Sequence, residues 1–210
     1  MKHIVWDWNG TLFHDIDAVV GATNELFRPY GLTTLTADDF RSVYTRPIWV
    51  AYERMLGRPL HEGEWELLDE GFHLHYHRLM LECDLAGDCR TSLADWERSG
   101  GSQSLLSMWG HDRLVPKVAE FGIDHHFTRV DGLRAPAGGP KAEHMVAHIA
   151  ALGVDPRDVL VIGDSVDDAD AARHVGARAV LYTGGMTPRS TLQTLGIPVV
   201  DTLAEALDHA

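Results

Sequence analysis

The sequence predicts an α/β fold: a doubly wound, parallel-sheet, Rossmann-like core with an inserted α-helical cap domain. Short apolar runs of four or five residues recur near the start and through the second half of the chain. Such continuous runs are typical of strands that are buried on both faces of a parallel sheet. Helical patterns alternate with these runs, as they do when helices cover the sheet. Residues 14–100 show helical spacing without a convincing strand, which indicates the insertion.

Five apolar runs that end on small or acidic residues are the predicted core strands: 3–7, 103–107, 158–164, 178–182 and 197–201. A weaker strand pattern covers 125–132. Helices are predicted at 140–153, which closes at a glycine, and at 165–176, which begins at a serine suited to an N-cap. The chain therefore divides into a core domain (1–13 and 101–210) and a cap domain (14–100).

The composition is that of a globular protein with one core domain and a modest insertion. The 210 residues include 31 acidic and 18 basic side chains, for a formal net charge of −13. This charge repels nucleic acids and anionic membrane surfaces, so we expect neither as a partner. It also repels phosphorylated ligands, so a site for such a ligand needs a local cation. The sequence is compatible with a monomer or a homodimer.

The lengths of the apolar runs and the spacing of the two cysteines indicate the cellular location. The first run stops at Asp7, which is unlike a signal peptide. No apolar stretch approaches the roughly 20 residues of a membrane span. Cys83 and Cys89 form no metal-type pair, and reduced structural thiols are usual in the cytosol. We therefore expect a cytoplasmic protein.

Acidic motifs follow two of the predicted strands. Asp7 ends the first strand and precedes an Asn-Gly-Thr turn, and Asp164 ends a later strand with Asp168 four residues further on. Binding sites of open parallel sheets lie at the carboxyl ends of the strands. Two carboxylates there repel each other unless a cation lies between them, and all-oxygen ligation suits Mg²⁺. One Asp at a strand end is usually a loop cap, but two such motifs favour a magnesium site.

With these motifs the chain resembles the haloacid dehalogenase-like (HAD) superfamily, and within it the phosphoglycolate phosphatase-like hydrolases that carry a helical cap. The four motifs of that family stand in order: "DWNGT" (7–11), Ser107 closing "SLLS", Lys141 in "GPKAEH", and "GDSVDD" (163–168). Each motif is weak alone. Four in register, with a helical insertion between the first and second, are specific, and the resemblance covers the whole chain.

The resemblance implies a Mg²⁺-dependent phosphatase that acts on a small phosphorylated metabolite through an aspartyl-phosphate on Asp7. Ser107 would hydrogen-bond the phosphoryl group, and Lys141 would balance its charge. A carboxylate is an adequate nucleophile when a cation masks the repulsion between two anions. The implied site residues are Asp7, Asn9, Ser107 and Lys141 for catalysis; Thr11, Ser107 and Arg46 for the substrate; and Asp7, Asn9 (through its backbone carbonyl), Asp164 and Asp168 for the metal.

Asn9 departs from the family pattern. Phosphatases of the family carry a second Asp there, which protonates the leaving alcohol and then activates water. An amide carries no proton at neutral pH, and losing an acid–base group costs roughly 10²–10⁴ in rate. The enzyme is then slow, or its leaving group needs little protonation, or another side chain such as His14 deputises, although an exposed hinge histidine is the more common role. Deamidation at Asn9-Gly10 is a further hypothesis.

The alternative function is a catalytically weak or inactive HAD-fold protein that binds a phosphorylated ligand in a regulatory role. Retention of Asp7 favours catalysis, because a pure binding protein needs no nucleophile. The cap residues 14–100 contain no lysine, which excludes the Schiff-base chemistry of the family's phosphonate hydrolases.

Each of three further features of the sequence has an ordinary structural explanation as well as a functional one. Arg46 lies where caps of the family often face the active site and could bind a carboxylate or second phosphate, although a solvated arginine is the more common role. His73 and His77 share a helix face, but without a third ligand they indicate a solvated surface rather than a metal site. Trp8 and Trp109 are expected to pack in the core or to shape the pocket mouth.

Overall fold

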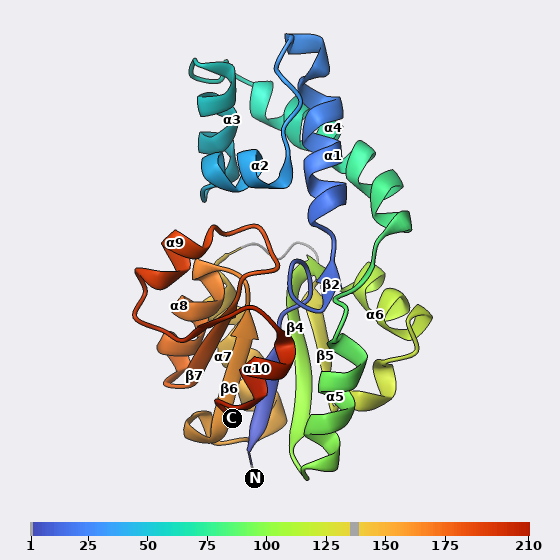
Figure 1. The fold of residues 1–210 in the computed structure, drawn as a ribbon, viewed down its shortest axis with the longest axis vertical. Coiled ribbons are helices and arrows are strands. Elements are labelled where there is room, and N and C mark those ends of the chain that lie inside the picture. Colours follow the sequence, from blue (N-terminus) through green and yellow to red (C-terminus); the bar gives the residue numbers. More distant parts are fainter. Residues whose placement is uncertain (1, 135–138) are drawn as a thin grey trace.

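The computed structural model describes residues 2–134 and 139–210. Figure 1 shows an α/β core with a group of helices standing above one end of its sheet, and both termini at the opposite end. The predicted fold class, a parallel sheet flanked by helices with an inserted helical domain, is confirmed. No helix in the described residues is long and apolar enough to cross a membrane.

Within the described residues, the core sheet has six strands, all parallel, in the order β5-β4-β1-β6-β7-β8. They are β1 (His3–Trp6), β4 (Ser102–Gly110), β5 (Val130–Leu133), β6 (Val159–Gly163), β7 (Arg178–Tyr182) and β8 (Val199–Val200). β1 lies between β4 and β6, which places the first motif of the chain at the centre of the sheet.

Two strands differ from the sequence prediction. The weak pattern at 125–132 yields a strand only from Val130, because the chain first forms a single 3-10 turn, Asp124–His126. At 197–201 the regular strand is only Val199–Val200. The preceding Pro198 has no N–H to donate to a ladder, although its carbonyl accepts from Leu181 at 2.9 Å.

Helices cover both faces of the sheet, and the alternation along β1 shows why. Ile4 and Trp6 face one apolar cluster, which includes Leu93 of α5, whereas Val5 faces a second, which includes Met145 of α7. Both alternating sets of a strand must be apolar when both faces are buried. The core helices are α5 (Cys89–Arg98), α6 (His111–Glu120), α7 (Lys141–Leu152), α8 (Val166–Val175), α9 (Arg189–Gln193) and α10 (Leu203–Leu207), with a 3-10 turn at Pro156–Asp158.

The cap consists of α1 (Ile16–Phe27), α2 (Ala37–Val43), α3 (Ile48–Leu56) and α4 (Glu64–Leu79), with 3-10 turns at Arg28–Tyr30 and Met80–Glu82. Two short antiparallel strands, β2 (Phe13–His14) and β3 (Asp84–Leu85), pair where the chain enters and leaves the cap. The sequence did not indicate this pair. The predicted cap range of 14–100 includes α5, which contacts α10 and β4 of the core. We therefore propose that the cap ends near β3.

Candidate active site

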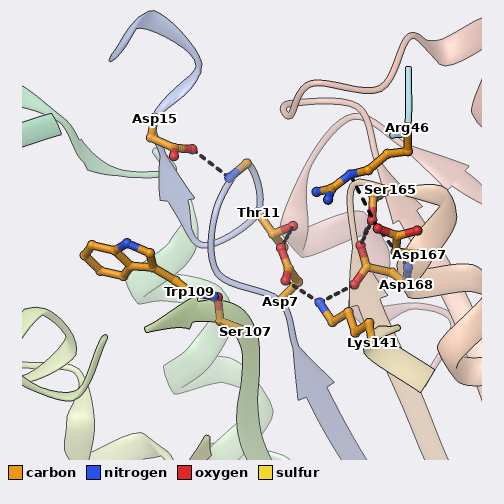
Figure 2. Close-up of polar contacts among 11 residues, drawn as sticks. Asp7, Thr11, Asp15, Arg46, Ser107, Trp109, Lys141, Ser165, Asp167 and Asp168 are labelled. Carbon is orange, nitrogen blue, oxygen red and sulfur yellow. Dashed lines mark hydrogen bonds and ion pairs between the residues drawn. The ribbon is translucent and has the colours of Figure 1, made fainter. Parts of the chain in front are cut away.

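The strand order brings predicted site residues together at the carboxyl ends of the central strands. Asp7 directly follows β1, and its N–H donates to the Ile162 carbonyl of β6 at 2.9 Å. Asp164 directly follows β6, and Ser107 lies on β4, on the other side of β1. Lys141 is the first residue of α7. Figure 2 shows the Lys141 side chain lying between the carboxylates of Asp7 and Asp168.

Lys141 is a buried cation held by two carboxylates. Its Nζ forms ion pairs with Asp7 and, at 2.5 Å, with Asp168. Burial by itself lowers the pKa of Lys141, but the carboxylates of Asp168 and Asp7 outweigh it and hold that pKa above its usual value. Burial raises the pKa of Asp7 to about 6, an effect that Lys141 opposes. The lysine therefore stays charged and masks part of the negative charge of Asp7.

The cluster holds more negative charge than this lysine balances. Oxygen atoms of Asp7, Asp164 and Asp168 all lie within 4.8 Å of one another, and all three residues are buried. Burial and the neighbouring carboxylates raise the pKa of Asp164 well above its usual value. The glycine backbone is close as well, since a Cβ on Gly10 would lie 2.7 Å from Asp164 Oδ2. This compact, all-oxygen donor set fits Mg²⁺.

Asp168 has both of its oxygens engaged. Its Oδ2 accepts from the N–H of Ser165 at 3.0 Å and from the Ser165 hydroxyl at 2.6 Å, which closes a capping box at the start of α8. Its Oδ1 faces Lys141. Asp168 thus links the start of α8 to the lysine, and we infer that it supports the site by positioning Lys141.

The hydroxyl groups of Thr11 and Ser107 lie near Asp7 but have different surroundings. Thr11 is fully buried, donates to Asp7 Oδ2 at 3.3 Å, and does not line the cavity above the site. We therefore infer that Thr11 orients Asp7 rather than touching a substrate. Ser107 does line the cavity, and its Oγ accepts the N–H of Trp109 at 3.0 Å. The hydroxyl hydrogen of Ser107 can therefore donate to a bound oxyanion.

The site opens into a cavity of about 300 Å³ between the core and the cap. Core residues form its floor, among them Asp7, Asn9, Ser107, Lys141 and Asp164. Cap residues form its wall, among them Phe40, Tyr44, Arg46, Tyr52, Phe72 and Tyr76. A ligand in this cavity would touch the acidic cluster and the cap together.

Arg46 reaches from the cap towards the core helix α8 (Figure 2). Its Nε donates to the Tyr44 hydroxyl at 3.2 Å and lies 3.5 Å from Asp167 Oδ2. The Arg46 side chain is 60% exposed, and such exposed ion pairs are weak. An anionic group of a ligand could therefore draw Arg46 away from Asp167 at small cost.

Asn9 belongs to a hydrogen-bonded network that the sequence analysis missed. Its Nδ2 donates to Asp15 Oδ2 at 2.8 Å and to the Tyr76 hydroxyl oxygen at 2.9 Å. Asp15 Oδ1 accepts the Gly10 N–H at 2.9 Å. Burial raises the pKa of Asp15, and these hydrogen bonds oppose the rise. The acidic residue beside the hinge was a possible signal for Asp15, whereas nothing in the sequence relates Tyr76 to Asn9.

The remaining predicted residues lie away from the acidic cluster or in the core. His14 is exposed and does not line the cavity. His73 and His77 stack at 5.6 Å between ring centroids, but in residues 2–134 and 139–210 they belong to no group of three potential metal ligands. Trp8 is fully buried in the core, whereas Trp109 lines the cavity.

The chain is similar in sequence and in fold to known hydrolases. Residues 136–206 match a family model described as HAD-hydrolase-like. The chain is 29% identical over 202 residues to a phosphoglycolate phosphatase of Caulobacter vibrioides, covering 94% of this chain and 85% of that protein. It is 24% identical over 198 residues to a phosphoglycolate phosphatase of Chromobacterium violaceum, covering 91% and 89%. A solved haloacid dehalogenase-like hydrolase from Streptococcus pneumoniae shares the fold, with a TM-score of 0.83 at 18% identity and coverage of 100% and 98%.

Proposed function

We propose that the chain, which is similar to phosphoglycolate phosphatases and matches a HAD-hydrolase-like family model over residues 136–206, is a Mg²⁺-dependent phosphatase of a small phosphorylated metabolite. We further propose that the reaction passes through an aspartyl-phosphate on Asp7. One observation carries the proposal: Asp7, Lys141 and Asp164 meet on the floor of a cavity that the cap covers.

Asp7 is oriented for nucleophilic attack by its neighbours. Lys141 holds Asp7 Oδ1, and the Thr11 hydroxyl donates to Asp7 Oδ2, so the carboxylate is fixed at both oxygens. The Ser107 hydroxyl is placed to donate to the phosphoryl group as it transfers. Phosphoryl transfer asks mainly for such positioning and for neutralised charge.

The metal proposal fits the excess of negative charge at the cluster. Asp7, Asp164 and the backbone carbonyl of Asn9 would hold Mg²⁺, while Asp168 keeps Lys141 in place. When bound there, the ion supplies positive charge that lets a carboxylate approach a phosphate dianion. Arg46 would bind a second anionic group of the substrate from the cap side.

Phosphate release in the presence of Mg²⁺ tests this function. The panel should hold phosphomonoesters, including phosphoglycolate, and acyl phosphates, each given to wild type, Asp7→Asn and Lys141→Met. Asp7→Asn keeps the shape of the side chain and removes the nucleophile, so release should fall by at least about 10³. Undiminished release by Asp7→Asn would overturn the assigned role of Asp7, and no release from any compound by wild type would overturn the function.

We also propose a cytoplasmic location. Cys83 and Cys89 are both free thiols, as is usual for proteins of a reducing compartment. Fractionation of cells that express the tagged full chain tests this point, and recovery outside the cytoplasmic fraction would contradict it.

A further inference from the structure

Asn9 has no amide hydrogen left for a substrate. Its Nδ2 donates to Asp15 and to the Tyr76 hydroxyl oxygen, at 2.8 and 2.9 Å. The Tyr76 hydroxyl donates in turn to the same Asp15 oxygen at 2.6 Å. Because a carboxylate only accepts, the nitrogen end of the amide must face Asp15. The three groups close a ring of hydrogen bonds that uses both amide hydrogens.

Position 9 therefore offers a departing oxygen neither a proton nor a hydrogen bond. Asp15 is the acceptor in its bonds with Asn9, Tyr76 and Gly10, so in this arrangement it donates nothing either. An alkoxide leaves phosphorus slowly without a proton. A phenolate leaves readily, because its negative charge spreads into the aromatic ring.

Aromatic side chains line much of the cavity above the acidic cluster. They come from three cap helices and from the core: Phe40 on α2, Tyr44 at its C-terminal end, Tyr52 on α3, Phe72 on α4 and Trp109 on β4. The cavity of about 300 Å³ lies at the small end of the roughly 300–1,000 Å³ usual for ligand pockets. Its size and its rings suit one planar ring, which can stack on aromatic neighbours.

We propose that the natural substrate is an aryl phosphate, a phosphomonoester whose leaving group is an acidic hydroxyl on an aromatic ring. This rests on the phosphatase function proposed above. Asn9, in this account, selects leaving groups that depart as anions, and the cap rings select their shape. The chain's departure from the second acidic residue is then matched to its substrate and is not simply a loss of activity.

The two steps balance without a proton from the protein. In the first, an Asp7 oxygen bonds to phosphorus, the bond from phosphorus to the ring oxygen breaks, and the electron pair leaves with the phenolate. In the second, water adds to phosphorus, both of its protons remain on phosphate oxygens, and the Asp7 carboxylate is released. An aryl phosphate dianion and water thus give a phenolate and dihydrogen phosphate.

A leaving-group series measures the claim directly. Nitrophenyl, phenyl and benzyl phosphates, glycerol phosphate and phosphoglycolate would be compared at saturating Mg²⁺, and log kcat/KM would be plotted against the pKa of the leaving hydroxyl. For wild type the plot should fall steeply, by at least about 10² from nitrophenyl to benzyl phosphate, since no acid assists. A flat plot with measurable phosphate release would overturn the aryl proposal and leave the phosphatase function intact.

The matched variant is the exchange Asn9→Asp/Asp15→Asn. Asn9→Asp alone places two carboxylates against each other, whereas the double exchange keeps one amide and one carboxylate in the ring with Tyr76. Position 9 then carries a titratable group. The value of kcat/KM for benzyl phosphate should rise about 10-fold to 10³-fold, so the plot should flatten. An unchanged slope in a folded double variant, checked by circular dichroism, would overturn the assigned role of Asn9.

Two further comparisons separate the ring from the leaving-group chemistry. Acetyl phosphate has an acidic leaving group without a ring. Phe72→Leu should raise KM for phenyl phosphate several-fold and raise KM for acetyl phosphate much less. A strong wild-type preference for acetyl phosphate would indicate that the substrate is an acyl phosphate rather than an aryl phosphate. His73 lines the cavity and lies 3.6 Å from Asp69. If His73→Gln steepened the plot, a cap acid would be assisting, which contradicts the proposal.

Discussion

Asn9 is held by its neighbours in a way that bears on its own chemical stability. Deamidation at Asn-Gly requires the glycine nitrogen to attack the asparagine side chain. Here the Gly10 N–H donates to Asp15 Oδ1 and to the Phe13 carbonyl, both at 2.9 Å, and the Asn9 amide is fixed by Asp15 and Tyr76. The folded loop thus holds both reacting groups in other bonds.

We therefore predict that Asn9 survives in the native protein. Peptide mapping after prolonged incubation at mildly alkaline pH should find Asn at position 9 in the folded chain. The same chain kept in urea should lose it, because the loop no longer restrains Gly10. Conversion in the native sample at the rate of the unfolded one would show that the loop gives no protection.

At Asp164 we predict a stabilising effect of the metal that does not depend on activity. The Mg²⁺ ion proposed for this cluster would bind only the folded chain. It should therefore raise the melting temperature relative to EDTA by a few degrees, since about 1 kcal/mol shifts Tm by roughly 2–4 °C in a chain of this size. Asp164→Asn should lose this shift. Exposed Asp155→Asn is the matched control and should keep it. An equal shift in wild type and Asp164→Asn would place the ion elsewhere.

At the scale of elements, a buried polar chain ties β1 to β4 and α7. His3 contacts Ser102 and Ser104 through its two ring nitrogens at 2.7 and 2.8 Å, and His148 contacts Ser104 and Asp131 at 2.8 and 2.7 Å. If His148 donates to Asp131, each hydroxyl and ring nitrogen in the chain finds one complementary partner while both histidines are neutral. With both histidines neutral, this arrangement leaves none of these hydroxyls and ring nitrogens unsatisfied.

Acid should therefore weaken the core. Burial, and then His148, lower the pKa of His3 from 6.5 to about 4, and burial lowers that of His148 although Asp131 opposes it and Arg129 and Lys141 add to the fall. The unfolded chain takes up these protons first. The two neutral histidines therefore make their full contribution to the free energy of unfolding above pH 6.5. This contribution declines as pH falls towards 4, by at most about 3 kcal/mol for His3.

Urea unfolding of wild type and His3→Gln across this range measures the effect. His3→Gln should be less stable at neutral pH and should lose less stability between pH 6.5 and 5 than wild type. Because the buried aspartates are present in both proteins, the difference between the two curves isolates His3. Parallel curves would mean that His3 does not titrate with unfolding.

Elements also show how far the sequence could predict the fold. β1 and β6 were predictable, because each is an apolar run buried on both faces and is followed directly by an Asp. The β2–β3 pair was not, because two-residue strands carry no periodicity and their partners lie far apart in the chain. Asp7, Lys141 and Asp164 follow from motifs at strand and helix ends. Tyr76 does not, because only the folding of the cap brings α4 onto Asn9.

At the scale of the whole molecule, the formal charge of −13 opposes the approach of a phosphate dianion. Raising salt from about 0.01 to 0.1 M shortens the Debye length from about 30 to 10 Å. At constant free Mg²⁺, kcat/KM for phenyl phosphate should therefore rise a few-fold. A fall with salt would show that local cations such as Lys141 and Arg46 dominate the field that the substrate meets.

Trapping the phosphoenzyme would show whether Asp7 becomes phosphorylated during turnover. A substrate labelled in its phosphoryl group would be mixed with enzyme and Mg²⁺, quenched in acid within the first turnover, and the label mapped by peptide analysis. The peptide that contains Asp7 should carry the label in wild type, and no label should be found in Asp7→Asn. Phosphate release in wild type without any labelled peptide, undiminished in Asp7→Asn, would contradict this prediction.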